Sequence, residues 1–314
     1  MAEATLLRGR HEQRKIAGAA IVSGEVHQMA DGRAGIYAGL DAKASGDNLT
    51  MITEGQYTLP KTSGIALLAG GRAYWDHSAN KVHFKPVNDR DFYLGTVAAD
   101  AAAADTTCVV NLNVHQEPII KLGKGSWTKS DSLGLGTLNE VGGEVVACEF
   151  DAVAEAARAS LISDRSFAVG ANGIMEAIID VADNGTAAAL DINVGIANAG
   201  HATDADLIAE SCFIHIDGND LNIFAESDDG TTEVGATDTT KDYVVGTVFE
   251  AWIDMRDPAD MQLYIDGVNV LPATVFKLDA ATGPLKALIH VEKTSNNTTA
   301  KPRILDLLVR TMED

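Results

Sequence analysis

The chain has 314 residues, of which 46% are hydrophobic and 22% are charged, and this composition is ordinary for a globular protein. A chain of this length predicts two domains. The formal net charge of −21 excludes nucleic acid and anionic membranes as favourable partners, because both carry the same sign of charge.

The first 17 residues differ in charge from the rest of the chain. Arg8, Arg10, Arg14 and Lys15 give residues 1–17 a net charge of +2, whereas the other residues hold 20 basic and 43 acidic groups, a net of −23. A basic arm on an acidic body favours docking on an acidic partner surface. Two simpler explanations stay open: a disordered terminus, and an acidic surface that only maintains solubility.

Short β-like runs separated by turn residues fill residues 18–114. Strands this short with connections this tight predict a compact, β-barrel-like domain. The Ala-rich stretch 98–104 is compatible with one helical turn or with a loop. The predicted strands are 19–23, 35–38, 49–59, 65–68, 72–75, 81–85, 93–98 and 107–113.

Residues 115–144 are rich in glycine, with six glycines between positions 123 and 143. Long loops without structure are uncommon inside compact domains, so we place a domain boundary and a linker here. The linker has room for one strand or hairpin at 117–122. It separates the β domain at 18–114 from a second domain at 145–314.

Longer strands return from residue 145 onward. The run 248–255 alternates, so that Phe249, Ala251, Ile253 and Met255 share one face, which predicts a two-sheet sandwich. Asp217-Gly218-Asn219 and Asp266-Gly267 are hairpin turn signals. For 152–160 we favour a strand over a helix. The other predicted strands are 173–182, 190–197, 212–217, 219–225, 261–265, 285–293 and 301–312.

Four short motifs occur in a fixed order in the first domain: GQYTLPK at 55–61, GGRAYWD at 70–76, LGTV at 94–97 and VVNL at 109–112. Together they resemble a family of tailed-phage capsid cement, or decoration, proteins over roughly residues 18–114. The resemblance implies a structural role on the phage head, and it carries no catalytic residues with it.

The second domain resembles concanavalin-like, or laminin-G-like, jelly-roll sandwiches. The residues that carry this resemblance are FEAWID at 249–254 and QLYIDGV at 262–268. They imply a strand followed by a hairpin within a jelly roll. A fold of this kind says little about function by itself.

Motifs of catalysis and metal binding are absent from the sequence. There is no nucleophile elbow, no phosphate-binding loop, and no metal-ligand spacing among the histidines. Acidic turns at 217–220 and 228–230 are better explained by turn chemistry than by Ca²⁺. Cys108, Cys148 and Cys212 form no disulfide or metal pattern and are expected to be buried, reduced thiols. We expect no enzyme activity, cofactor or metal.

Glu250, Trp252 and Asp254 share one face of a predicted strand and are candidate glycan-binding residues. The two carboxylates are about 13 Å apart along a regular strand. Glycosidases need about 5–5.5 or 6.5–9.5 Å, which argues against hydrolysis. Glycan binding without hydrolysis stays open.

The function we expect from the sequence is capsid decoration. The protein would bind the major capsid protein on the outer surface of the assembled head through Arg8, Arg10, Arg14 and Lys15, as a homotrimer on threefold positions of the capsid. Trp75 would belong to the core rather than to a subunit interface. The N-terminus lacks the apolar stretch of a signal peptide, so we expect synthesis in the host cytoplasm. The alternative is a carbohydrate-binding or adhesin module that uses the sandwich.

Overall fold

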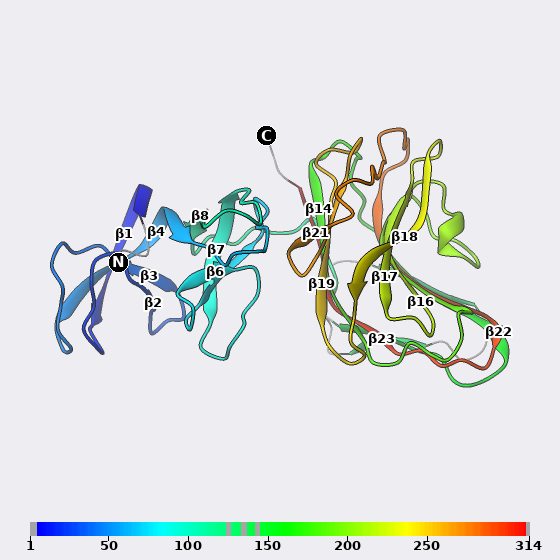
Figure 1. Cartoon of the computed structure of the whole chain (residues 1–314), viewed down its shortest axis with the longest axis horizontal. Coiled ribbons are helices and arrows are strands. Elements are labelled where there is room, and N and C mark those ends of the chain that lie inside the picture. Colours follow the sequence, from blue (N-terminus) through cyan, green and yellow to red (C-terminus); the bar gives the residue numbers. More distant parts are fainter. Residues whose placement is uncertain (1–4, 124–126, 133–136, 142–144, 312–314) are drawn as a thin grey trace. The chain divides into compact units, whose positions relative to one another are not determined.

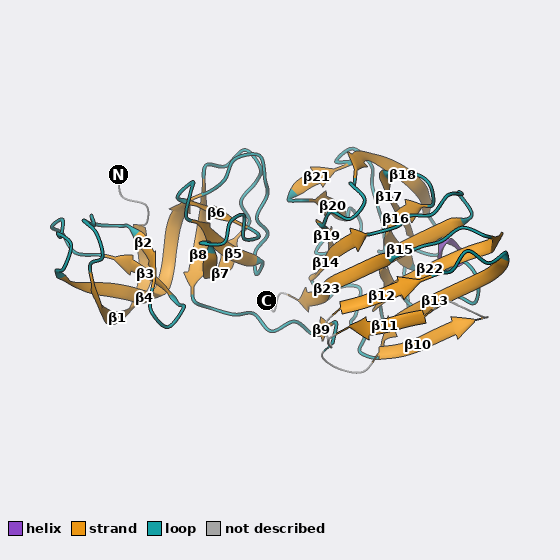
Figure 2. Ribbon diagram, turned by 90° about the horizontal axis from the view of Figure 1, so that it is seen from below, coloured by secondary structure: helices purple, strands orange, loops and turns teal. Residues whose placement is uncertain are grey.

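The computed structural model describes residues 5–123, 127–132, 137–141 and 145–311 of the chain. These residues form strands throughout, with one short 3₁₀ helix, η1(Ala205–Leu207) (Figure 2). The all-β expectation is therefore confirmed. The chain divides into two compact units, residues 1–117 and 118–314, which run from blue to cyan and from green to red in Figure 1.

The first unit is one curled antiparallel sheet. Its strand order is β2-β3-β4-β8-β7-β5-β6, and β1 pairs with β4 outside this path. The strands are β1(Thr5–Ile16), β2(Val26–Gln28), β3(Ala34–Tyr37), β4(Asn48–Pro60), β5(Arg72–Asp76), β6(Lys81–His83), β7(Phe92–Ala99) and β8(Thr107–Leu112). The predicted strands at 19–23 and 65–68 are reduced to single bridges, Ile21 to Lys43 and Leu67 to Ala101.

The curled sheet closes on itself at the end of β4. Lys61, directly after β4, forms a parallel bridge with Val82 of β6, so that β4, β8, β7, β5 and β6 make a ring. Trp75 on β5 lies opposite Val82 and Phe92 on the two neighbouring strands and is fully buried. The barrel-like prediction and the placement of Trp75 in the core are both confirmed.

Two residues of the sequence motifs have structural roles in this barrel. Lys61 is 1% exposed, and its Nζ donates to the carbonyl oxygens of Thr62 and Ile65, at 3.0 and 2.6 Å. Gly95 has φ of 145°, and a Cβ atom there would lie 2.0 Å from the carbonyl oxygen of Asn111 on β8. Only glycine fits this approach of two backbones.

The basic segment at the start of the chain is a strand over the residues that the structure describes. β1 runs antiparallel to β4 from the pair Thr5–Thr58 to the pair Ile16–Asn48, with register shifts along the way. This replaces the expectation of a free arm or disordered tail for residues 5–16. The physical reason is that a long β4 offers an edge whose backbone groups need partners.

The second unit consists of two antiparallel sheets. One has the order β10-β13-β22-β15-β16-β17-β18, and the other has the order β11-β12-β23-β14-β19-β20-β21 with β9 paired to β23. The strands are β9(Ile120–Lys121), β10(Trp127–Ser132), β11(Thr137–Val141), β12(Val145–Glu149), β13(Glu155–Ser163), β14(Gly173–Val181), β15(Leu190–Ala197), β16(Ser211–Asp217), β17(Asn222–Asp228), β18(Glu233–Asp242), β19(Phe249–Asp254), β20(Gln262–Ile265), β21(Val268–Val270), β22(Lys286–Asn296) and β23(Pro302–Thr311).

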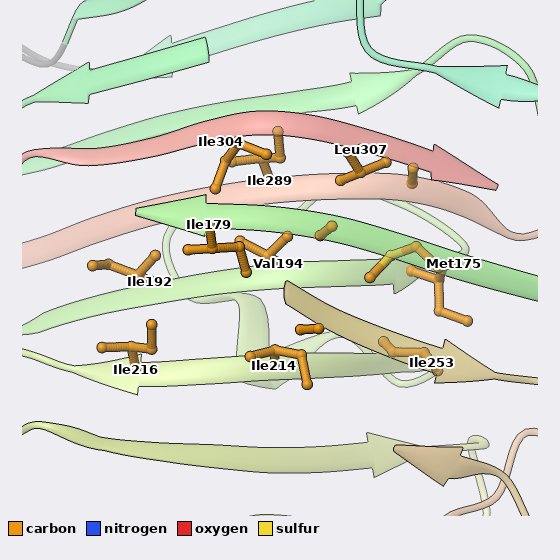
Figure 3. Close-up of a cluster of buried hydrophobic side chains, with 14 of the residues drawn as sticks. Met175, Ile179, Ile192, Val194, Ile214, Ile216, Ile253, Ile289, Ile304 and Leu307 are labelled. Carbon is orange, nitrogen blue, oxygen red and sulfur yellow. The ribbon is translucent and has the colours of Figure 1, made fainter. Parts of the chain in front are cut away.

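The core of the second unit lies between its two sheets. Met175, Ile179 and Ile253 come from one sheet, and Val194 and Ile214 come from the other (Figure 3). All of these side chains are 0–1% exposed. The chain crosses repeatedly between the sheets, since β13, β15 and β22 belong to one and β14, β19 and β23 to the other. This arrangement is the two-sheet jelly-roll sandwich that the sequence predicted.

The glycine-rich stretch is less of a linker than the sequence indicated. Three strands, β9, β10 and β11, fall within residues 115–144 and pair with β23, β13 and β12. The division between the units falls at residue 117. Glycine content misled the prediction here because the strands between the glycines are short, and the partner of β9, β23, lies far along the chain.

Local turn chemistry is as predicted. Asp266 and Gly267 have φ of 48° and 75° and join β20 to β21 as a two-residue hairpin, since Ile265 pairs with Val268. In the acidic turn at 228–230, Oδ1 of Asp229 accepts hydrogen bonds from the backbone nitrogens of Thr231 and Thr232. That carboxylate is occupied by the turn itself.

The three cysteines, Cys108, Cys148 and Cys212, are free and buried, as expected. Burial raises the pKa of the Cys108 thiol to about 12, so it is protonated at neutral pH. Among the described residues, no helix has both the length and the apolar character needed to cross a membrane.

Trp75 is the largest fully buried side chain of the first unit. We expect Trp75→Ala to destabilise this unit by about 3–5 kcal/mol, because a large buried ring is replaced by a cavity. Denaturant unfolding of the full chain measures the loss. Val87→Ala, at a residue of the same unit that is 52% exposed, is the control and is expected to change the free energy of unfolding by less than about 0.5 kcal/mol. Equal effects of the two substitutions would contradict this view of the core.

Candidate functional site

The predicted capsid-binding residues lie on the edge strand β1. Arg8, Arg14 and Lys15 are paired in register with Gln56, Thr50 and Leu49 of β4. Arg14 is exposed, and the half-buried Lys15 donates from Nζ to the carbonyl oxygen of Gln28 at 2.8 Å. Burial lowers the pKa of Lys15. The side chains of Arg8 and Arg10 lie outside the described part of the structure, so their contact with a capsid stays a prediction.

The candidate glycan-binding residues share one face of β19, as the alternation predicted, but they are not open to solvent. Glu250, Trp252 and Asp254 are 3%, 4% and 6% exposed. Nε1 of Trp252 donates to Oε1 of Glu250 at 2.8 Å. The Trp252 ring also packs against Tyr264, with 5.6 Å between ring centroids.

Asp254 is engaged in an ion pair. Arg256 donates from Nε to Oδ1 of Asp254 at 2.8 Å and from Nη2 to Oδ2 at 2.6 Å. A sugar ring needs an exposed aromatic face and available polar groups. The described structure shows no exposed aromatic face at Trp252, and glycan binding by this trio stays a prediction.

The structure reveals a different polar site, on the seven-stranded sheet. On the face opposite to its core, polar side chains line up across neighbouring strands. One row runs from His290 on β22 through Asn193 on β15 to His215 on β16. The adjacent row is Arg158, Glu292, Asp191 and Asp217. We call the group formed by Asp191, Asn193, Asp206, His215, Asp217 and Glu226 the His215 cluster.

His215 is the centre of this cluster and is 3% exposed. Its Nε2 lies 2.8 Å from Oδ1 of Asp217. Its Nδ1 lies 3.4 Å from Oδ1 of Asp206 and 3.4 Å from Oε1 of Glu226. One imidazole thus faces three carboxylates that come from β16, β17 and the η1 segment.

Asp206 reaches the cluster because η1 is held down on the sheet. Ala205 and Ile208 pack against Ala197, Phe213 and Leu288 in a small apolar group. Asp204 caps η1 by accepting a hydrogen bond from the backbone nitrogen of Asp206. The Asp206 carboxylate then accepts a hydrogen bond from Nδ2 of Asn193 at 3.0 Å.

Burial and charge crowding shift the ionisation of the cluster. Burial alone would lower the pKa of His215, but hydrogen bonds to Asp206, Asp217 and Glu226 outweigh it and raise the pKa to about 12. Burial raises the pKa of Glu226 and that of Asp191 to about 7, against the opposing effect of His215. With His215 as the cation of the cluster, Glu226 and Asp191 retain protons near neutral pH, whereas isolated carboxylates would be ionised.

A second pair, His290 and Glu292, lies on the same face of the sheet. Nε2 of His290 is 2.7 Å from Oε2 of Glu292. Burial lowers the pKa of His290 to about 4, and burial raises that of Glu292 to about 8. Both groups are therefore neutral at pH 7. Beside them a cavity of ≈ 330 Å³ is lined by residues that include Arg158, Asp204 and Leu207.

Sequence reasoning missed this site because its members lie far apart along the chain. The local signal is the alternation within β16 and β22, which places His215 with Asp217 and His290 with Glu292 on the face away from the core. That signal cannot show which strands are neighbours. The register between β15 and β16, and the packing of η1, bring the remaining carboxylates together.

Comparison with known families confirms the resemblance of the first unit. A family model described as phage cement protein matches residues 9–112. This range falls within the first unit and contains all four sequence motifs. A search of curated proteins found no match.

Several solved structures are similar in part. The Emp47p carbohydrate recognition domain is 11% identical, with a TM-score of 0.44 over 60% of this chain and 89% of that chain. LamAcat from Zobellia galactanivorans is 12% identical, with a TM-score of 0.38 over 54% and 78%. An alginate lyase of polysaccharide lyase family 7 is 17% identical, with a TM-score of 0.37 over 57% and 83%. Scores this low carry no argument about binding or catalysis, so the sandwich assignment depends on strand pairing alone.

Ionisation of Glu292 gives a measurable pH dependence. Its pKa is about 8 in the folded chain and about 4.3 when unfolded, so its stabilising contribution is complete below pH 4.3 and is lost as the pH rises through 8. Glu292→Gln stays neutral. We therefore expect the variant to gain stability relative to the parent protein as the pH rises from 5 to 9, measured by thermal unfolding. Glu233→Gln, at an exposed residue of β18, is the control. If the unfolding temperatures of the parent protein and Glu292→Gln changed in parallel with pH, the raised pKa of Glu292 would be contradicted.

Proposed function

We propose that this protein is a phage capsid decoration protein, which binds the outer surface of the assembled head and stabilises it. The observation that carries the proposal is the match of residues 9–112 to a phage cement protein family, on a unit whose strands β4 to β8 close into a ring. Cement proteins are structural, which also supports a role without catalysis.

The architecture of the first unit supports a binding role. The motif residues Lys61, Trp75 and Gly95 serve the barrel itself, through buried carbonyl contacts, core packing and close backbone approach. The basic strand β1 lies at the edge of the sheet, and its only strand partner in the described structure is β4. Charged residues on an edge strand keep it from pairing with other chains and leave it available for a partner of opposite charge.

Decoration would stabilise the head by mass action. A ligand that binds the assembled shell but not its separated subunits favours assembly by RT ln(1 + [L]/Kd). Contacts that are weak singly become strong when several are made at once on a lattice, because each later contact is intramolecular. A homotrimer on threefold positions of the capsid would provide such multiple contacts, with the major capsid protein as the partner.

The second unit would be displayed on the virion by the first. The alternative that this sandwich binds carbohydrate receives no support from Trp252, which is buried and bonded to Glu250. Capsid decoration is therefore the function that the observations favour.

The basic strand provides the test. Deleting residues 1–17 would remove β1 and uncover β4, so charge reversal is the better experiment. We expect Arg14→Glu to weaken binding to undecorated capsids by about 1 kcal/mol, roughly fivefold in Kd, because an exposed attractive charge becomes repulsive. Adding Arg8→Glu and Arg10→Glu should weaken binding further. Co-sedimentation with capsids at low and high salt measures both effects.

The matched control is Arg90→Glu, which makes the same charge change at an exposed residue of the same unit. It is expected to leave occupancy unchanged, since it lies in the loop between β6 and β7 and not on β1. Equal losses for Arg14→Glu and Arg90→Glu would show a general charge effect and remove β1 from the interface. Failure of the parent protein to bind capsids at all would refute the decoration role. The mass of the protein in solution tests the trimer separately.

A further inference from the structure

We propose that the His215 cluster is a binding site for a divalent transition-metal ion, with Nδ1 of His215, Oδ1 of Asp206 and Oε1 of Glu226 as ligands. Zn²⁺ is the ion that this donor set fits best. The proposed site belongs to the second unit and is independent of capsid binding by the first.

The Nδ1 contacts are long for hydrogen bonds, and their lengths also match the spacing of two ligands around one metal ion. Nδ1 of His215 is 3.4 Å from each of the two carboxylate oxygens. Hydrogen bonds between nitrogen and oxygen are usually about 2.7–3.2 Å long. Two ligands that are each about 2.0–2.1 Å from a tetrahedral zinc ion lie about 3.4 Å apart. All three donor atoms are within 4.8 Å of one another, as a shared ion requires.

The orientation of the imidazole ring supports the same conclusion. Nε2 of His215 is 2.8 Å from Oδ1 of Asp217, close enough for an N–H to donate to the carboxylate. A metal-bound histidine commonly makes this contact through its other nitrogen, which fixes the ring and increases the basicity of the ligating atom. In a neutral ring whose Nε2 keeps its proton, Nδ1 has a lone pair on the side of Asp206 and Glu226, and a bound ion would replace the proton that Nδ1 carries without it.

The charge balance calls for a cation. Four carboxylates surround His215: Asp191 on β15, Asp217 on β16, Glu226 on β17 and Asp206 on η1. The nearby Arg158 on β13 donates to the carbonyl oxygen of His201 and to Oγ of Ser130, at 2.9 and 3.0 Å. A protonated His215 supplies one positive charge beside these four groups, and Glu226 and Asp191 retain protons near neutral pH because their pKa is raised to about 7. A dication would offset the excess.

An independent observation comes from Asn193. Its side chain is fully buried, its Nδ2 lies 3.0 Å from Oδ1 of Asp206, and its Oδ1 has no hydrogen-bond partner. A buried amide oxygen without a partner costs about 1–3 kcal/mol. Rotation of the amide by 180° would give up the hydrogen bond from Nδ2 to Asp206 and turn Oδ1 to that side, where it would supply a further oxygen ligand to a bound ion.

The donor types decide between metals. Ca²⁺ takes 6–8 oxygen ligands, and an imidazole nitrogen at the centre of the site does not suit it. A mixture of imidazole and carboxylate donors at tetrahedral spacing suits Zn²⁺, with Co²⁺ as a spectroscopic substitute. The bound ion would join the η1 segment to β16 and β17. Binding would therefore stabilise the folded second unit in proportion to the free metal concentration.

The test uses the untagged full-length protein after treatment with a chelator. We expect one Zn²⁺ per chain by elemental analysis after dialysis, a higher unfolding temperature with Zn²⁺, and visible absorption by the Co²⁺ form typical of nitrogen and oxygen ligands. His215→Ala should abolish uptake. Asp206→Asn should weaken it at least tenfold, and Asp217→Asn should weaken it by about 10–100-fold through the orientation of His215.

Controls separate loss of the site from loss of the fold. Asp206 is exposed on a short segment, so Asp206→Asn is expected to fold even if His215→Ala does not. His77→Ala removes a histidine from the first unit and should leave Zn²⁺ uptake unchanged. Undiminished uptake in both Asp206→Asn and Glu226→Gln would overturn the assignment. Absence of uptake by the folded parent protein would also overturn it, and would leave His215 as a protonated partner of the acidic groups.

Discussion

The alternation of side chains along paired strands is the constraint on which this structure depends. The central strands of the second unit turn one set of residues into the space between the sheets, as Ile214 and Ile216 do on β16. The residues that alternate with them, Phe213, His215 and Asp217, must then lie on the other face. Because the core fixes the register, it also fixes which polar residues become neighbours on the opposite face.

The first unit uses the same constraint for a different result. Its single sheet curls until β6 reaches the end of β4, so that one face encloses Trp75 and the other faces outward. Motif residues that carry the family resemblance stabilise this closed sheet. Lys61 donates hydrogen bonds to backbone carbonyl groups, and Gly95 permits close contact with β8. What remains for recognition is the outer surface and the edge strand β1, where the basic residues lie.

The two units are both built from antiparallel sheets, but the first carries basic residues on β1 and the second carries carboxylates around His215. Positive charge on β1 is spread along an edge, which suits attraction to an extended acidic surface. Negative charge in the His215 cluster is concentrated around a buried imidazole, and burial raises the pKa of Glu226 and Asp191. A concentrated site of this kind suits a small ion rather than a protein surface, because burial strengthens short-range electrostatic interaction.

The sequence by itself determined the β class, the two-unit organisation, the Asp266-Gly267 hairpin, the alternation at 249–255 and the family resemblance of the first unit. These features depend on local periodicity, turn chemistry and short motifs. Only the tertiary structure decided that β1 joins β4, that β9 to β11 belong to the second unit, that Trp252 is buried, and that four carboxylates surround His215. The reason is physical: strand pairing joins residues far apart along the chain, and local patterns carry no information about which strands become partners.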